Sequence, residues 1–526
     1  MGILCSHPFP ATGSPSCLAC ALVTATGLRV AEKRSLTGDE SISYLAAACH
    51  QGDYARPAVA ERPPVGRWVA AAEWKALLRP ERALCLGEIG RDLAREDIHP
   101  PLYFWLLHGW ALLFGVGLWT GPSLNIAIAG LTTLALFALA RRTLGGLLPA
   151  AGVAAAWSFS PAAIRVFAEA RQYELLALIA VLFVWQCVRF CDPPTETPGR
   201  DGLLLAAIVA AGALTQFLFA LVAVAGAALL VARLWGSDHR LLASGLASLA
   251  AGYVAFAMVH PGYALSLRRG RAEAVASATD RLGGRTEQSI DTIAGFLVPP
   301  NLADGELAWF FAALLFGAAT WLAAWALRGR GRPVSSAAAI PLIVVWLIAA
   351  HIALFVSFLA PWHAMSFKYQ SVIWPFAAFV PVLAVLALPR SPRRVVAPLL
   401  GVALIVSGSV AAVGLFPGPP PHPALERAPQ LMVDTVSRRV LPRIVWRVPD
   451  RTPVFAADQR YLLEHEQEWI SRLGPRAVVV SYPRSGTLHG QRRILKAAAL
   501  RRHSQDRETP SVSRTVPRAA RGTRGR

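Results

Sequence analysis

The chain has 526 residues, of which 54% are hydrophobic and 16% are charged, and its formal net charge at pH 7 is +20. Its mean hydropathy is +0.44. Soluble domains carry about 25% charged residues, so this composition excludes an ordinary soluble enzyme and indicates a polytopic membrane protein.

Apolar stretches long enough to cross a bilayer, about 20 residues, recur along the chain. We expect eleven spans, at residues 15–31, 122–140, 145–164, 174–190, 202–217, 218–235, 241–262, 306–327, 336–360, 371–389 and 395–416. The arginines between them fall in alternate short loops, and such residues are retained in the cytoplasm. The sequence therefore predicts a multi-pass protein of the inner (plasma) membrane with a cytoplasmic N-terminus. The C-terminal segment and the loops at 32–121, 165–173 and 361–370 are expected outside.

One further apolar stretch, HPPLYFWLLHGWALLFG at 99–115, suggests a twelfth span. Counting it would place every later arginine cluster on the opposite side of the membrane. We therefore predict that 102–115 is a juxtamembrane helix at the outer face, amphipathic or half inserted, which begins after Pro100 and Pro101.

The segment after the last predicted span has a different pattern. TPVFAADQ, YLLEHEQEWISRL and RAVVVSYPR, between 452 and 484, predict a strand, a helix and a strand. We expect a membrane domain over 1–416, a small extracytoplasmic α/β segment over 417–490 and a basic disordered tail over 491–526. An outer position favours lipid headgroups, cell-wall polymers or solvent, rather than nucleic acid, as surroundings of this tail.

The cysteines give few signals. The C-x-x-C pattern at 17–20 lacks an accompanying βαβ pattern, so we interpret it as part of an apolar helix. Cys187 and Cys191, one turn apart in a predicted span, are interpreted in the same way. Cys49 and Cys85 lie in the first outer loop, where oxidation is possible, and the sequence is compatible with either a disulfide or two thiols.

Polar residues gather in three outer loops. The candidates are Asp39, Glu40, Asp97 and His99 in the first loop, Glu169, Arg171 and Tyr173 in the second, and Lys368 and Tyr369 in the third. Charges near membrane depth are costly and tend to mark functional sites, although they can also be solvated loop charges or helix ends. The carboxylates of the first loop should face Arg171 and Lys368 of the later loops on one side of the membrane. This arrangement predicts an acid–base group beside a cationic group.

Three motifs occur in order: GDESISYLAAA at 38–48, EDIHPPLYFWLLHGWALLFG at 96–115 and SPAAIRVFAEARQYELLAL at 160–178. Over about 27–190 the chain resembles the bacterial glycosyltransferases of family 39, relatives of protein O-mannosyltransferases and lipid A aminoarabinose transferases. The likeness continues more weakly, through FKYQSVIWPF, to about residue 416. The chain departs from the family's pattern at Ala168, where a glutamine is usual, at Lys368, where an aromatic residue or arginine is often found, and at Gln216, where many relatives have histidine.

The resemblance implies a GT-C fold enzyme that transfers a sugar, with inversion, from a polyprenyl-phosphate donor to an acceptor at the outer face. The reaction needs a base for the acceptor and positive charge for the leaving phosphate. The implied roles are Asp39 as base, Glu40 and Glu169 as its partners, Arg171 and Lys368 as phosphate clamp, and Asp97, His99, Tyr173 and Tyr369 as further substrate contacts. A Mg²⁺ or Mn²⁺ ion between Asp39, Glu40 and Glu169 is conceivable, although no spacing requires it.

Two other classes fit a polytopic protein with membrane charges. A transporter or flippase is disfavoured because the sequence shows no inverted repeat and its charges cluster in loops rather than in mid-span. A glycan polymer ligase of the cell envelope with the same fold is a closer alternative. The sequence names neither the sugar nor the acceptor.

Overall fold

The computed structural model describes residues 33, 35–55, 63–191, 196–276, 292–297, 306–327, 336–358, 367–414, 423–482 and 488–508. The chain forms two compact units. Unit 1 comprises Met1–Ala55 and Leu77–Pro420, and unit 2 comprises Arg56–Ala76 and Pro421–Arg526. A boundary at residue 417 was predicted, but residues 56–76 of the first predicted outer loop also belong to the C-terminal unit.

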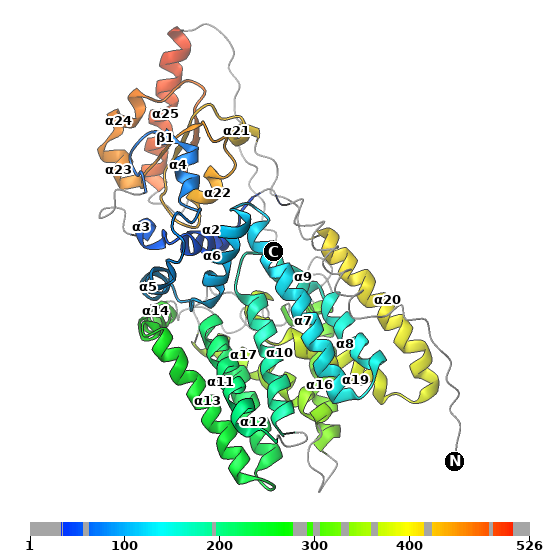
Figure 1. Cartoon of the computed structure of the whole chain (residues 1–526). Coiled ribbons are helices and arrows are strands. Elements are labelled where there is room, and N and C mark those ends of the chain that lie inside the picture. The colour runs from blue at the N-terminus through cyan, green and yellow to red at the C-terminus, as the bar shows by residue number, and fades with distance from the viewer. Residues whose placement is uncertain are drawn as a thin grey trace, which may run out of the picture. The chain divides into compact units, whose positions relative to one another are not determined.

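Unit 1 is helical in its described residues. Its helices are α2 (Gly38–Ala47), α3 (Gln51–Ala55), α5 (Leu86–Glu96), α6 (Leu102–Phe114), α7 (Thr120–Leu144), α8 (Leu147–Ser158), α9 (Pro161–Phe167), α10 (Tyr173–Cys191), α11 (Pro198–Thr215), α12 (Phe219–Leu234), α13 (His239–Val259), α14 (Tyr263–Ala276), α16 (Glu306–Leu327), α17 (Ser336–Phe358), η2 (Phe367–Gln370), α18 (Trp374–Ala377), α19 (Phe379–Ala387) and α20 (Arg390–Gly414). The short helices α2, α3, α5 and α6 lie together at one end of the long helices α7, α10, α11 and α13 (Figure 1).

A helix or a pair of helices covers each predicted span from residue 122 onward. The predicted span at 15–31 lies outside the described residues. Among those described, five helices are long and apolar enough to cross a membrane: Thr120–Leu144, Tyr173–Cys191, His239–Val259, Glu306–Ala324 and Arg390–Ala411. Shorter apolar helices, including α8 and α12, accompany them.

Local sequence explains where several helices stop. The predicted span at 145–164 is divided into α8 and α9 because the Ser160 side chain accepts the Ala163 N–H (3.1 Å) and Pro161 occupies the first turn of α9. Helix α7 ends at Gly145, whose φ of 74° is favourable for glycine.

Aromatic side chains pack between the long helices. The side chain of Phe183 on α10 meets that of Phe219 on α12, with ring centroids 5.3 Å apart.

Helix α6 corresponds to the predicted juxtamembrane segment. Its 13 residues give a length of about 20 Å, which is shorter than the roughly 30 Å hydrocarbon core of a bilayer. Leu106, Leu113 and Phe114 are exposed, whereas Tyr103 and Phe104 are fully buried. Helix α6 therefore has apolar side chains on both its packed and its exposed surface.

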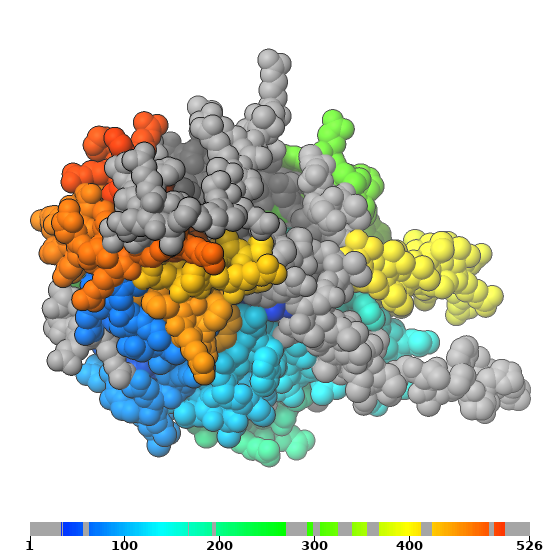
Figure 2. Space-filling view, turned by 90° about the horizontal axis from the view of Figure 1, so that it is seen from above, coloured from blue at the N-terminus to red at the C-terminus, as the bar shows by residue number. Residues whose placement is uncertain are grey.

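Unit 2 contains a four-stranded sheet in the order β1-β3-β2-β4. Its elements are β1 (Val69–Ala70), α4 (Ala71–Ala76), α21 (Pro423–Glu426), β2 (Leu431–Val433), α22 (Leu441–Val445), β3 (Pro453–Ala456), α23 (Gln459–Glu464), α24 (Glu466–Ser471), β4 (Val478–Val480) and α25 (Leu488–Glu508). Strands β2, β3 and β4 are parallel, and β1 pairs with β3 in the antiparallel sense. Within unit 2, β1 and α4 (blue) thus lie beside C-terminal residues (orange), although they are far apart in the sequence (Figure 2).

Helix α25 corrects the prediction of a disordered tail over 491–508, whereas the rest of the predicted tail, 509–526, lies outside the described residues. The helix continues to Glu508, and Ile494 and Ala498 are buried in the core of unit 2 with Trp469. Residues four positions apart lie on one face of a helix, so these two apolar side chains pack as a stripe, whereas Arg492 and Arg493 are exposed. The high arginine content hid the stripe.

Candidate active site

Helix α2 begins with a capping box. Thr37 accepts the Glu40 N–H through its side chain (3.2 Å), and Glu40 accepts the Thr37 N–H through Oε2 (2.8 Å). This reciprocal pair satisfies two N–H groups that would lack partners at a helix start. The pattern fixes Asp39 in the first turn, where a carboxylate is favoured by the helix dipole.

Asp39 forms an ion pair with Lys368 of η2. About a quarter of the Asp39 side chain is exposed (25%), so the carboxylate is accessible from outside the helix bundle. The backbone oxygen of Asp39 accepts a hydrogen bond from Arg171 Nη1 (3.3 Å), and the Ser43 hydroxyl accepts another from the same nitrogen (3.3 Å). The first, second and third predicted loops therefore meet at Asp39.

The neighbouring carboxylate, Glu40, has a different environment. It is fully buried and forms an ion pair with Lys33. Its Oε1 atom also accepts the Ala170 N–H (2.9 Å), while Oε2 is used by the capping box. Both oxygens therefore hold other parts of the protein, in contrast to those of the partly exposed Asp39.

Asp97, His99 and Arg171 form a chain of hydrogen bonds. Asp97 Oδ1 lies 2.6 Å from His99 Nδ1, and Arg171 Nη2 lies 3.1 Å from His99 Nε2. Arg171 can only donate, so Nε2 accepts and Nδ1 carries the proton that is donated to Asp97. Gln51 donates to the other oxygen of Asp97 (3.0 Å), which connects this chain to α3.

Burial and charge tune these groups. Burial lowers the pKa of His99, and the neighbouring Arg171 adds to this effect against the opposing carboxylate of Asp97. Burial disfavours the charge of Arg171, but Asp39 and nearby acidic groups outweigh it and raise the pKa of the guanidinium. Burial also raises the pKa of Glu169, as do Glu40 and Asp39, whereas Lys368 opposes the rise. The site therefore combines a neutral histidine with a permanently charged arginine.

The loop between α9 and α10 carries Glu169 and Arg171. Asn125 of α7 donates to the backbone oxygens of both residues, at 3.3 Å for Arg171. The guanidinium of Arg171 lies 6.0 Å from the centre of the Tyr173 ring, and the Tyr173 ring meets that of Tyr369 edge-on at 5.5 Å. The two tyrosines therefore join the second and third predicted loops beside the arginine.

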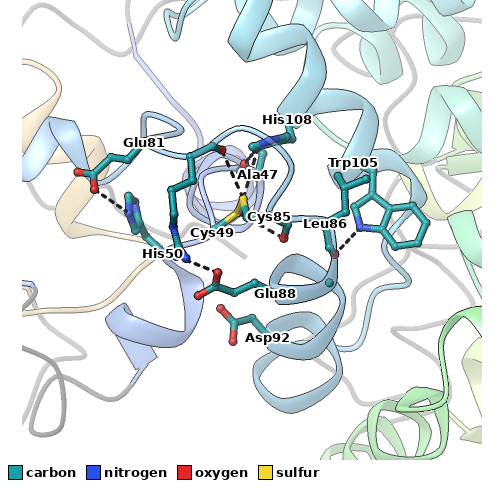
Figure 3. The surroundings of a disulfide bond; sticks show 12 residues. Ala47, Cys49, His50, Glu81, Cys85, Leu86, Glu88, Asp92, Trp105 and His108 are labelled. Carbon is teal, nitrogen blue, oxygen red and sulfur yellow. Dashed lines mark hydrogen bonds and ion pairs between the residues drawn. A yellow bond between two sulfur atoms is a disulfide. The ribbon is translucent and has the colours of Figure 1, made fainter.

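A disulfide between Cys49 and Cys85 links the end of α2 to the start of α5 (Figure 3). His108 of α6 lies next to it, with Nδ1 2.7 Å from the backbone oxygen of Ala47. Cys49 has a φ of 65°, a conformation that is uncommon for a residue with a side chain. The following residue, His50, contacts the Leu77 oxygen through Nδ1 (2.8 Å). Of the two arrangements compatible with the sequence, the structure has the disulfide.

The predicted metal ligands do not share one site. Among the described residues, a metal-ligand spacing occurs only for Cys49, Cys85 and His108, and the two sulfur atoms are bonded to each other. The oxygens of Glu40 already bind Lys33 and backbone N–H groups. This donor set does not fit the divalent ion that was considered between Asp39, Glu40 and Glu169.

The structure brings all nine predicted site residues into one region of unit 1. At the end of α11, Gln216 Oε1 accepts the N–H of Phe217 (2.8 Å). Sequence reasoning missed Lys33 and Asn125. Asn125 could have been found as a lone amide in an apolar span. The T-x-x-E pattern at 37–40 is the sequence signature of the capping box that starts α2.

The family of dolichyl-phosphate-mannose-protein mannosyltransferases matches residues 98–264, about a third of the chain. The fold is similar to that of ArnT from Cupriavidus metallidurans bound to undecaprenyl phosphate, at 15% identity and a TM-score of 0.53, over 90% of this chain and 94% of that chain. The apo state of ArnT gives a TM-score of 0.50 at the same identity and coverage. The arabinofuranosyltransferase AftD from Mycobacteria gives 0.47 at 15% identity, over 85% of this chain and 32% of that chain.

No curated protein matches the chain by sequence. The likeness to ArnT, together with the family match, shows that the chain has the GT-C fold of membrane glycosyltransferases. The apolar helices agree with a multi-pass membrane protein of this class.

Proposed function

We propose that this protein transfers a sugar from a polyprenyl-phosphate donor to an acceptor at the extracytoplasmic face of the membrane, with inversion. The observation that carries the proposal is at the loops of a GT-C fold, where Lys368 pairs with the partly exposed Asp39 carboxylate and Arg171 binds the backbone oxygen of the same residue. A transporter would instead need its charges in mid-span around a central cavity. The likeness to a protein solved with undecaprenyl phosphate supports a lipid phosphate as the donor's carrier.

Asp39 acts as the general base in this proposal. An acceptor hydroxyl or amine attacks the anomeric carbon, the bond from that carbon to the phosphate oxygen breaks, and the acceptor's proton passes to Asp39. A single displacement of this kind inverts the anomeric centre. The helix start holds the carboxylate in a fixed position, so that little reorganisation is needed at the moment of transfer.

Lys368 and Arg171 receive the charge that develops on the leaving lipid phosphate. Arg171 offers a planar set of donors that matches phosphate geometry, and His99 and Ser43 hold it in place. Lys368 pairs with Asp39 in the structure. We infer that Lys368 exchanges this carboxylate for the donor phosphate, which leaves Asp39 able to accept the proton.

Two other parts of the proposal concern orientation and metal. The disulfide favours an oxidising, extracytoplasmic location for Cys49 and Cys85, in agreement with eleven spans, an inner N-terminus and an outer C-terminal unit. Reporter enzymes that are active only outside the cytoplasm should be active after residue 430 and inactive after residues 142 and 392. Transfer after dialysis against EDTA, with and without re-added Mg²⁺ or Mn²⁺, tests whether the reaction needs a divalent ion.

The decisive experiment is a transfer assay with purified protein and polyprenyl-phosphate sugars of several kinds, with membrane glycans, lipids and proteins offered as acceptors. Wild-type protein should transfer at least one sugar, and Asp39→Asn should lower turnover by about 10² to 10⁴, the usual contribution of a general base. The variant should still bind the donor. Equal turnover of the variant and the wild type would remove Asp39 from the mechanism.

A further inference from the structure

The loop between α9 and α10 is held through its backbone by three side chains from separate parts of unit 1. Lys33 Nζ donates to the Ala168 oxygen (3.1 Å), and Glu40 Oε1 accepts the Ala170 N–H (2.9 Å). Asn125 donates to two further carbonyl groups of the loop, those of Glu169 and Arg171. Four consecutive residues thus each have a backbone group bound by a side chain from outside the loop.

The same loop is packed tightly from one side. A Cβ atom placed on Gly121, in the first turn of α7, would lie 2.1 Å from the Cβ atom of Ala170. Tyr44 accepts the N–H of Gly121 (2.8 Å) and donates to the Gly117 oxygen (3.0 Å), so this part of α7 is itself fixed to α2. The loop backbone therefore has little room to shift.

We propose that Lys33 and Asn125, together with Glu40, form a backbone clamp that positions Arg171 for the donor phosphate, an assignment that rests on the proposed function. The clamp residues act through the loop rather than on the substrate. A buried ion pair is a costly way to hold two backbone groups unless each charge is fully partnered. Here Lys33 has a carboxylate and a carbonyl as partners, and Glu40 has an ammonium and two N–H groups.

The role of Glu40 then differs from that of its neighbour. The Asp39 side chain is partly exposed, and its ion-pair partner is the long side chain of Lys368 in η2. Every contact of Glu40 belongs instead to the clamp or the capping box. Positioning of an active-site group to within about 0.5 Å is typical of what productive geometry requires. The clamp supplies that constraint at the one loop that carries Arg171.

Amide hydrogen exchange of the loop, measured on peptides spanning residues 165–176, tests the clamp independently of catalysis. Lys33→Met and Asn125→Leu should each raise exchange there by about tenfold or more, and Lys33→Arg should restore part of the protection. Gln186→Met is the matched control, because it removes a buried donor to the Asp201 oxygen (3.1 Å) elsewhere in the same unit. It should leave exchange of the loop unchanged.

The affinity for undecaprenyl phosphate, used as the probe, measures whether the clamp positions Arg171 for the donor phosphate. Lys33→Met and Asn125→Leu should weaken it about tenfold, and the control variant should bind as the wild type does. If Lys33→Met alone misfolds because Glu40 is left unpaired, the Lys33→Met/Glu40→Gln double variant removes both charges and should show the same loss of loop protection. Wild-type exchange in the lysine and asparagine variants would overturn the clamp. Absence of binding by the wild type, with raised exchange in the variants, would instead overturn the lipid-phosphate donor and leave the loop clamp in place.

Discussion

Removal of the disulfide between Cys49 and Cys85 should loosen the helices that carry the site. The bond closes a loop with a sequence separation of 36 residues, and residues 56–76 of that loop belong to unit 2. In the chain-entropy description, releasing a loop of this length gives the opened state about 4 kcal/mol. This free-energy change is an upper limit, because the segment that belongs to unit 2 keeps the loop partly constrained.

The effect reaches the site through α3. His50, Gln51 and Gly52 follow Cys49 and bind the Leu77 oxygen, Asp97 and Asp92, respectively. If these contacts open locally, Asp97 no longer holds His99 toward Arg171. A change of 4 kcal/mol corresponds to about 10³ in an opening equilibrium, so amide protection in α2 and α3 should fall by up to about 10³, and turnover should fall with it.

The assay compares Cys49→Ser/Cys85→Ser with wild type, with and without dithiothreitol, by hydrogen exchange, thermal midpoint and donor binding. Cys187→Ala/Cys191→Ala is the control, since both residues are buried thiols that form no disulfide. The serine variant should have low protection in both conditions, and the control should respond to reductant as the wild type does. Unchanged protection in the serine variant would refute the link between the bond and the site.

The remaining predictions concern single site residues. Arg171→Ala should lower kcat/KM for the lipid-phosphate donor by about 10² or more, with partial recovery in Arg171→Lys because an ammonium lacks the planar fork; equal kinetics in wild type and Arg171→Ala would contradict the phosphate role. Lys368→Met should raise the donor KM more than the acceptor KM, and equal effects on both would argue against its exchange from Asp39 to phosphate. The lowered pKa of His99 keeps this residue neutral at pH 7. Protonation as the pH falls through that lowered pKa, which lies below the ordinary 6.5, would remove the acceptor for the Arg171 N–H, so activity and local stability should fall on the acid side. His99→Gln, which accepts without titrating, should weaken that acid limb, and an identical acid limb in the variant would assign it to another group.

The sequence predicted the helical framework and most residues of the candidate site because apolar length and loop charge are local signals. Asp39, Arg171 and Lys368 stand out as charges beside spans. The pattern could not tell Asp39 from Glu40, since their difference arises from Lys33 and from a backbone N–H 130 residues away. The same limit explains α25, where the spacing of buried residues was concealed by the arginines around them, and the small strand β1, whose two residues carry no periodic signal.

The construction of unit 2 sets an order for biogenesis. Val69 is made early, but its partner on β3, Val454, leaves the ribosome only after every long apolar helix of unit 1 has been synthesised. During that interval the strand has no edge to pair with, and unpaired strand edges are prone to misassembly. Premature termination before residue 421 would leave β1 and α4 permanently without the rest of their sheet. We therefore expect nascent chains of this protein to depend on assistance for the segment 56–76 until translation is nearly complete.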